Sequence, residues 1–248
     1  MSTLRAEMLK YKRTFMAKLV IFIPLFFAAY SLVTSYLVPG SYDWNGILVM
    51  SFNWWPVTFL PLGYGLFAGM VASQERKAGA YRVLKAEPFA PQRIWLGKIG
   101  GMALIAALSS CVLVAGDLLC GAIQGEVPSL ATMVMAALFC WLSTLALIPL
   151  QLWLATWAGM LASIALGAAG MFVGVLLAPT KLWLFCPWSW ATRLMAPTIG
   201  VHPNGVVLPD GDPLLDAGVL PLGLGIALVV FAVASALTAL WFAGRECR

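Results

Sequence analysis

No charged residue occurs between Glu126 and Lys181, and this absence restricts the possible fold more than any other feature of the chain. An α-helix needs roughly 20 apolar residues to cross the hydrocarbon core of a bilayer, so this stretch has room for two crossings joined by a tight turn. Only helices and closed barrels satisfy their backbone groups inside a bilayer. The apolar runs are continuous rather than alternating, which excludes a barrel. We therefore expect an all-α, polytopic membrane protein.

Composition supports this interpretation. Of the 248 residues, 62% are hydrophobic and 10% are charged, whereas a soluble domain is roughly 45–50% apolar and about 25% charged. Too few polar residues remain for a second, soluble domain, so we expect one membrane domain over residues 1–248. Six spanning helices are expected, approximately at residues 19–38, 54–73, 99–120, 129–150, 157–178 and 221–243.

The positions of the basic residues predict the topology. Thirteen of the fifteen Lys and Arg residues lie in the N-terminal segment, between Arg76 and Lys98, or at the C-terminus. Basic residues are enriched in cytoplasmic segments, so six spans with both termini in the cytoplasm satisfy this bias. The clusters therefore indicate topology in a cell membrane rather than binding to nucleic acid.

Residues 2–18 are expected to form an amphipathic helix on the inner membrane surface. Leu4, Met8, Tyr11 and Phe15 recur at helical spacing, and basic residues occupy the other faces. The alternative is a plain basic flank that only sets the topology.

The polar segment 74–98 is too long for a minimal turn between two spans. It mixes charges with a helical apolar pattern and is interrupted at Pro88 and Pro91. The segment forms either a docking surface for a cytoplasmic partner or a basic loop that touches lipid headgroups.

A second long loop, 179–220, follows the fifth span. Its Trp-rich first part is too apolar for a free loop and is expected to form short helices at the outer interface. His202, the only histidine, lies beside Pro203 and Asn204, which favours a turn.

Asp117 is the one acidic residue within a predicted span, and we expect it to reach the nearby outer interface. Three Gly pairs spaced by four residues would allow close helix packing: Gly65/Gly69, Gly97/Gly101 and Gly170/Gly174.

Several motifs are missing. The chain contains no P-loop, no HExxH and no G-x-S-x-G, and nothing predicts an active site. Five cysteines without C-x-x-C spacing indicate neither a disulfide framework nor a zinc site. No cofactor is expected, and any energy for transport would have to come from a partner subunit.

The sequence resembles lantibiotic immunity ABC transporter permease subunits of the MutE/EpiE type, which belong to the ABC-2 permeases. The resemblance runs in order along almost the whole chain. It rests on residues 7–15 with Pro24 and Leu25, on residues 52–56 and 60–63, on the pattern of charged and aromatic residues between Glu75 and Lys98, on residues 187–189 and 193–195, and on residues 202–205.

This resemblance implies a six-helix ABC-2-type permease that expels a lantibiotic or a related antimicrobial peptide from the membrane of a Gram-positive producer. The implied partners are a cytoplasmic ABC ATPase subunit, which would bind the ATP, and a second permease subunit, either a related chain or another copy of this one. The expected ATPase-docking residues are Glu75, Arg76, Lys77, Gly79, Tyr81, Arg82 and Leu84. The expected peptide-facing residues are Trp188, Trp190, Arg193, His202, Asn204, Asp210 and Asp212. Other possible functions are ABC-2 transport of a bacitracin-like or lipid-linked compound, and peptide sensing without transport.

Overall fold

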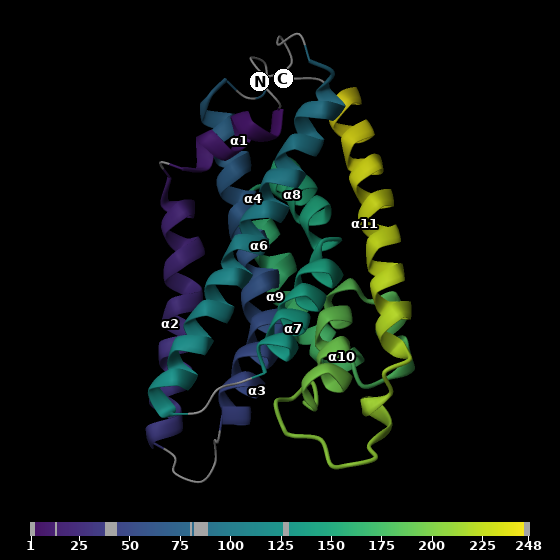
Figure 1. Ribbon diagram of the computed structural model, residues 1–248. Helices are drawn as coiled ribbons and strands as arrows, with labels where there is room; N and C mark the ends of the chain where they lie inside the picture. The colour runs from purple at the N-terminus through teal and green to yellow at the C-terminus, as the bar shows by residue number, and fades with distance from the viewer. Residues whose placement is uncertain are drawn as a thin grey trace.

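The computed structural model describes residues 3–12, 14–37, 44–79, 81, 89–125 and 129–245, and every regular element among them is a helix. Five helical segments are long and apolar enough to cross a membrane, and one bent pair of helices makes a sixth. The expected polytopic all-α fold is therefore confirmed. Helix α1 (Thr3–Tyr11) and the last turns of α11 (Val219–Gly244) lie at the same end of the bundle, which we name the termini end (Figure 1). The opposite end is named the distal end.

The first three crossings run up and down the bundle in sequence. Helix α2 (Phe15–Leu37) runs from the termini end to the distal end. The chain returns through α3 (Trp44–Trp54), a π-helical turn η1 (Trp55–Phe59) and α4 (Leu60–Lys77). Helix α6 (Pro91–Gln124) then leads back to the distal end. The π-helical turn lies where Pro56 and Pro61 each remove a backbone donor from the helical ladder.

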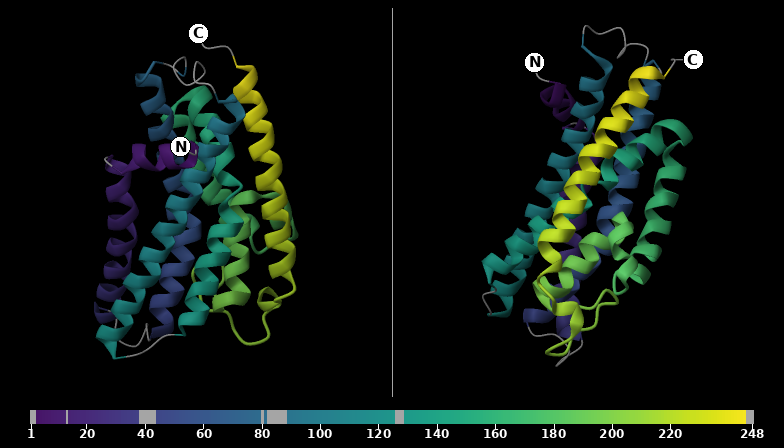
Figure 2. Two further views of the ribbon diagram at one scale, coloured as in Figure 1. Left: turned by 45° about the horizontal axis from the view of Figure 1, so that its top comes forward. Right: turned by 90° about the vertical axis from the view of Figure 1, so that its right-hand side faces the viewer.

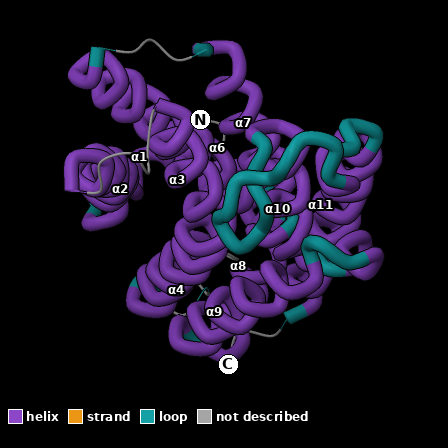
Figure 3. The backbone as a smooth tube through the Cα atoms, turned by 90° about the horizontal axis from the view of Figure 1, so that it is seen from below, coloured by secondary structure: helices purple, strands orange, loops and turns teal. Residues whose placement is uncertain are grey.

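The next two crossings come from the long uncharged stretch. Helices α7 (Leu130–Thr144) and α8 (Leu147–Ala158) are bent by 44° and are together long and apolar enough for one crossing. Helix α9 (Met160–Leu177) returns toward the distal end. There the short η2 (Lys181–Phe185) and α10 (Pro187–Ile199) precede the loop that leads to α11. Figure 3 shows α10 and this loop lying over the distal end of the bundle.

Several boundaries differ from those expected. The predicted loop 41–53 is helical from Trp44 onward, and the helix that contains the predicted third span begins at Pro91. The turn expected at residues 151–156 occurs instead at Gly159, whose φ of +97° favours glycine. Gln151 remains inside α8 because its amide donates to the Pro61 carbonyl oxygen and accepts from the Ser163 hydroxyl.

The N-terminal helix is shorter than expected, because α1 ends at Tyr11 and Phe15 begins α2. Its buried residues are Glu7 and Tyr11, so the face that packs inward is not purely apolar. Figure 2 shows α1 lying across the bundle while the long helices run along it.

Glycine allows the closest helix approaches. A Cβ at Gly65 would lie 2.8 Å from the Ser163 carbonyl oxygen of α9, and one at Gly174 would lie 2.7 Å from the Trp188 carbonyl oxygen of α10. The expected role of the Gly pairs in close packing is confirmed at these crossings. By contrast, large apolar side chains of α2, α9 and α11 remain exposed, including Phe22, Leu176 and Leu237. These faces suit contact with lipid, which is as apolar as the side chains themselves.

Candidate functional site

The termini end contains a buried cluster of four charged side chains, which we name the ionic cluster: Glu7 and Lys10 of α1, Glu75 of α4 and Lys98 of α6. Lys98 is fully buried, and Glu7 and Glu75 are 4% and 5% exposed. Lys10 Nζ lies 2.7 Å from Glu75 Oε1 and 3.0 Å from Glu7 Oε1. Lys98 Nζ lies 3.0 Å from Glu7 Oε1 and also pairs with Glu75 Oε1. Two bases therefore balance two acids, and the cluster ties three helices together.

The local sequence makes this arrangement possible. Helix α1 crosses α6 at Gly97 and Gly101, where an added Cβ would lie 3.1 Å from Thr3 and 3.1 Å from the Tyr11 ring. This close crossing brings Glu7 to Lys98. Burial on its own would lower the pKa of Lys10, but the hydrogen bond to Glu75 and the charges of both carboxylates outweigh it and raise that pKa. Lys10 therefore stays charged and completes the neutralisation of the two acids.

Tyr81 forms a second attachment point at the same end. It lies shortly after the end of α4 at Lys77 and has a φ of +68°, an uncommon conformation for a residue other than glycine. Its side chain is buried, its hydroxyl lies 3.3 Å from Thr156 Oγ1, and its ring packs edge-on against Phe242. The Arg245 guanidinium lies 5.9 Å from the centre of the same ring and donates to the Thr156 carbonyl oxygen. Tyr81 thus holds the start of the 78–90 connection against α8 and α11.

The expected docking residues are therefore divided by the fold. Arg76 and Lys77, in the last turn of α4, and Gly79 are exposed. The side chains of Glu75 and Tyr81 point into the protein and anchor this segment. Arg82 and Leu84 lie outside the described residues.

Sequence reasoning missed Glu7, Lys10 and Lys98 as partners of Glu75. One sequence feature could have indicated this pairing. Glu7 is the only acidic residue in the first 42 positions and lies within an otherwise basic segment.

The expected outer-loop residues are divided in the same way. Trp190 and Arg193 are buried, and their side chains donate to the carbonyl oxygens of Leu184 and Leu214. Burial lowers the pKa of Arg193, although the charges of Asp216 and Asp212 partly oppose this effect. The Trp188 ring packs against Gly170 of α9. These three residues fix α10 and the loop after it to the bundle.

The other residues expected to face the peptide lie nearer the protein surface. Asn204 and Asp210 are exposed, and His202 and Asp212 are half-buried. His202 Nδ1 accepts from the Asn204 amide, and Asn204 Oδ1 accepts from the Val206 amide, which confirms the predicted turn. Asp212 caps the short helix η3 (Pro213–Leu215) by accepting from the Leu214 amide at 2.8 Å.

Asp117 does not reach the interface as expected. It is fully buried, and Ser51 Oγ of α3 donates to its Oδ1 at 2.9 Å. The other carboxyl oxygen has no partner among the described residues. The expectation was wrong because α3 extends the second crossing toward the distal end and covers this face of α6.

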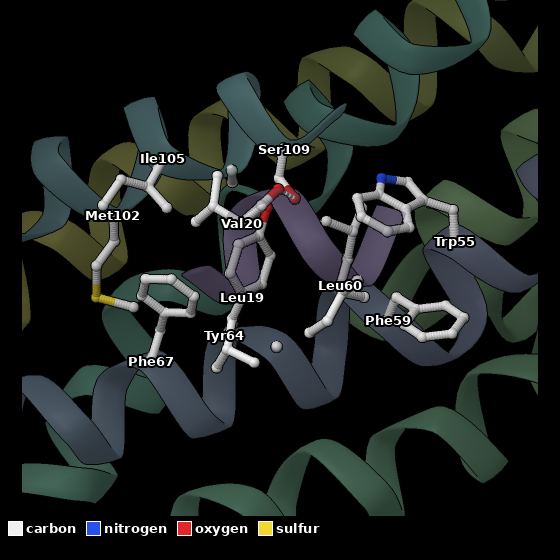
Figure 4. A pocket seen from close by; sticks show the side chains of 13 residues that line it. Leu19, Val20, Trp55, Phe59, Leu60, Tyr64, Phe67, Met102, Ile105 and Ser109 are labelled. Atoms are coloured by element: carbon white, nitrogen blue, oxygen red, sulfur yellow. Dashed lines mark hydrogen bonds between the residues drawn. The ribbon is translucent and has the colours of Figure 1, made fainter. Parts of the chain in front are cut away.

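An apolar pocket lies between α2, the η1–α4 segment and α6 (Figure 4). Trp55, Phe59 and Phe67 line one side, and Met102 and Ile105 of α6 line the other. The hydroxyl of Tyr64 in its wall is already hydrogen-bonded to Thr144. No charged side chain occurs among the described residues that line this pocket. In the part of the chain that the structure describes, no three His, Cys, Asp or Glu side chains gather closely enough to hold a metal ion.

Residues 3–174 match the family model described as ABC-2 family transporter protein, which covers more than half of the chain. The chain belongs to the ABC-2 transporter family. An ABC-2 permease is the membrane component of an ABC transporter and generally works with a cytoplasmic ATPase subunit, which hydrolyses the ATP. The match includes the ionic cluster and ends before α10 and α11. No curated protein and no solved structure matches the chain.

Proposed function

We propose that this ABC-2 permease expels a lantibiotic or a related antimicrobial peptide from the cell membrane and so protects the producing cell. The resemblance of its ordered sequence motifs to lantibiotic immunity permeases supports this substrate class. The distribution of basic residues supports an orientation in which the termini end faces the cytoplasm. A related permease or a second copy of this chain would complete the membrane part of the transporter.

One structural observation supports the docking role of the termini end: Arg76 and Lys77 are exposed directly beside two buried anchors, Glu75 and Tyr81. A partner that binds the exposed residues would push on a segment fixed to α1, α6, α8 and α11. Force applied by an ATPase would therefore reach the spanning helices rather than bend a free loop. The exposed Asn204 and Asp210 would face the peptide at the other side of the membrane.

The substrate class can be tested by survival of the producer strain, with and without this gene, across a panel of lantibiotics and bacitracin. A selective loss of resistance to one lantibiotic is expected, and it would identify the substrate. Loss of resistance to bacitracin alone would assign the permease to that other substrate class. Unchanged survival across the panel would contradict the immunity function and leave the family assignment in place.

Docking can be tested by reversing the two exposed charges with Arg76→Glu and Lys77→Glu. In the proposed interface, acidic residues of the ATPase would meet Arg76 and Lys77, and the new Glu side chains would repel them. Like charges brought together at an interface cost several kcal/mol, so we expect ATPase association and peptide resistance to fall at least roughly tenfold. The melting temperature should stay unchanged, because neither side chain is buried. ATPase copurification and survival assays measure the effect.

The matched control for docking is Lys18→Glu with Lys181→Glu, which makes the same charge change at two exposed positions outside this segment. Glu75 is left unchanged, since its reversal would break the ionic cluster and confuse docking with stability. Normal ATPase association of the Arg76/Lys77 variant would disprove the docking role.

A further inference from the structure

A second apolar groove lies on the surface of the bundle, next to α1 and on its distal side. Its walls come from α1, from the start of α2 and from the middle of α6. Ile21 of α2 and Leu108 of α6 are about half exposed in its walls, and Leu9 projects from α1. In the left view of Figure 2, α1 lies across the top of α2 and α6, so it forms the roof of this groove.

The groove results from how α2 and α6 pack. Toward the distal end the two helices meet closely, because a Cβ at Gly116 would lie 3.0 Å from that of Ala28 and Cys120 Sγ donates to the Ala28 carbonyl oxygen. Nearer the termini end, Ser109 Oγ donates to the Val20 carbonyl oxygen at 3.0 Å, and beyond this contact α2 and α6 diverge (Figure 1). The ionic cluster fixes α1 across the widened end. The space is therefore bounded by a close contact at one end and a fixed roof at the other.

Among the described residues that line the groove, the charged side chains belong to α1. Arg5 and Lys12 of α1 line its roof and are exposed, whereas the described residues of its walls on α2 and α6 are all uncharged. Glu7, the acid of α1, points the other way into the ionic cluster. A molecule that fits must therefore have a negative head beside α1 and an apolar body along α2 and α6.

We propose that this groove binds one anionic phospholipid, with its phosphate at Arg5 and Lys12 and an acyl chain between α2 and α6. The volume of about 640 Å³ lies within the roughly 300–1,000 Å³ of ordinary ligand sites. Helix α1 lies across the end of the bundle (Figure 2). The orientation proposed above would place it at the depth of lipid headgroups, where Lys and Arg attract anionic lipids. The bound lipid would contact the face of α1 that lines the groove, while the ionic cluster holds the opposite face. The site does not depend on which substrate the permease transports.

The test is a lipid titration of the purified full-length protein in detergent, with phosphatidylglycerol compared with phosphatidylcholine of the same chains. Native mass spectrometry counts the bound lipids, and thermal unfolding reports the stabilisation. Wild-type protein should retain one phosphatidylglycerol and gain melting temperature with it, and phosphatidylcholine should do neither. Equal effects of the two lipids would overturn the proposal, because the basic residues would then select nothing.

Two pairs of variants separate the head from the chain. Arg5→Ala with Lys12→Ala should weaken phosphatidylglycerol binding at least tenfold, whereas the equal charge change Lys77→Ala with Arg93→Ala should leave it unchanged. Cys111→Trp should fill the groove and abolish binding, whereas Leu119→Trp, at an exposed position of α6 outside the groove, should not. Retained binding in both groove variants would disprove the site.

Two further outcomes identify other occupants. Competition by glycerol phosphate at the same concentration as the lipid would indicate a simple phosphate site and contradict the lipid proposal. A cationic peptide that binds the groove more tightly in the Arg5/Lys12 variant than in wild type would assign the groove to substrate, because those two bases repel a cationic peptide.

Discussion

Replacing Lys98 with Met should lower the melting temperature of the detergent-solubilised protein by roughly 10 °C. Lys98 is fully buried and contacts both Glu7 and Glu75. Without it, two buried carboxylates share Lys10, whose side chain is 32% exposed. Breaking a buried ion pair from one side costs about 3–5 kcal/mol, and each kcal/mol shifts the melting temperature of a chain of this size by about 2–4 °C.

The design for Lys98 includes a control and a rescue. Arg93→Met makes the same charge change at an exposed position of the same helix, and its melting temperature should stay close to that of wild type. Adding Glu75→Gln to Lys98→Met removes the surplus negative charge and should restore part of the loss. Equal melting temperatures for Lys98→Met and Arg93→Met would show that the ionic cluster does not stabilise the bundle.

Gly174→Ala should also destabilise the protein, although it adds a single methyl group. The new Cβ would lie 2.7 Å from the Trp188 carbonyl oxygen and 3.0 Å from its Cβ. Backbone atoms cannot rotate away, so α10 must shift relative to α9. Overpacking of this kind costs about 1–3 kcal/mol, and we expect the melting temperature to fall by roughly 5 °C.

Gly225→Ala is the matched control for this substitution. Gly225 lies within α11, and nothing approaches within 4 Å of its added Cβ. Ala is favoured over Gly inside a helix by about 0.5–1 kcal/mol, so this variant should be slightly more stable than wild type. A rise in melting temperature for both variants would contradict the close contact between α9 and Trp188.

These two contacts stabilise opposite ends of the molecule for related reasons. At the termini end, Gly97 and Gly101 let α1 approach α6, and charge pairing fixes its position. At the distal end, Gly170 and Gly174 let α10 approach α9, and the buried Arg193 and Trp190 fix the rest of that segment. Short helices that do not cross the bilayer thus become rigid parts of the permease, because small residues beneath them allow direct backbone approach.

The candidate site was only partly predictable. The polar segment after the second span directed attention to Glu75, Arg76, Lys77 and Tyr81. Charge alone could not distinguish the exposed members from the anchors, because that distinction depends on which helix lies opposite each side chain. Glu75 is inside because Lys10 and Lys98, distant in sequence, converge on it. The burial of Asp117 likewise depends on α3, which the sequence pattern had assigned to a loop.

The sequence by itself determined the helical membrane fold and its apolar spans, because the length of an apolar run is a local property that the thickness of the bilayer selects. The order of its motifs along the chain carried the family resemblance. Only the tertiary structure decided the pairing of Glu7 with Lys98, the inward position of Tyr81, and the groove beneath α1. These features depend on the crossing of helices that are far apart in the chain, and a crossing is set by the shapes of two surfaces together rather than by either segment alone.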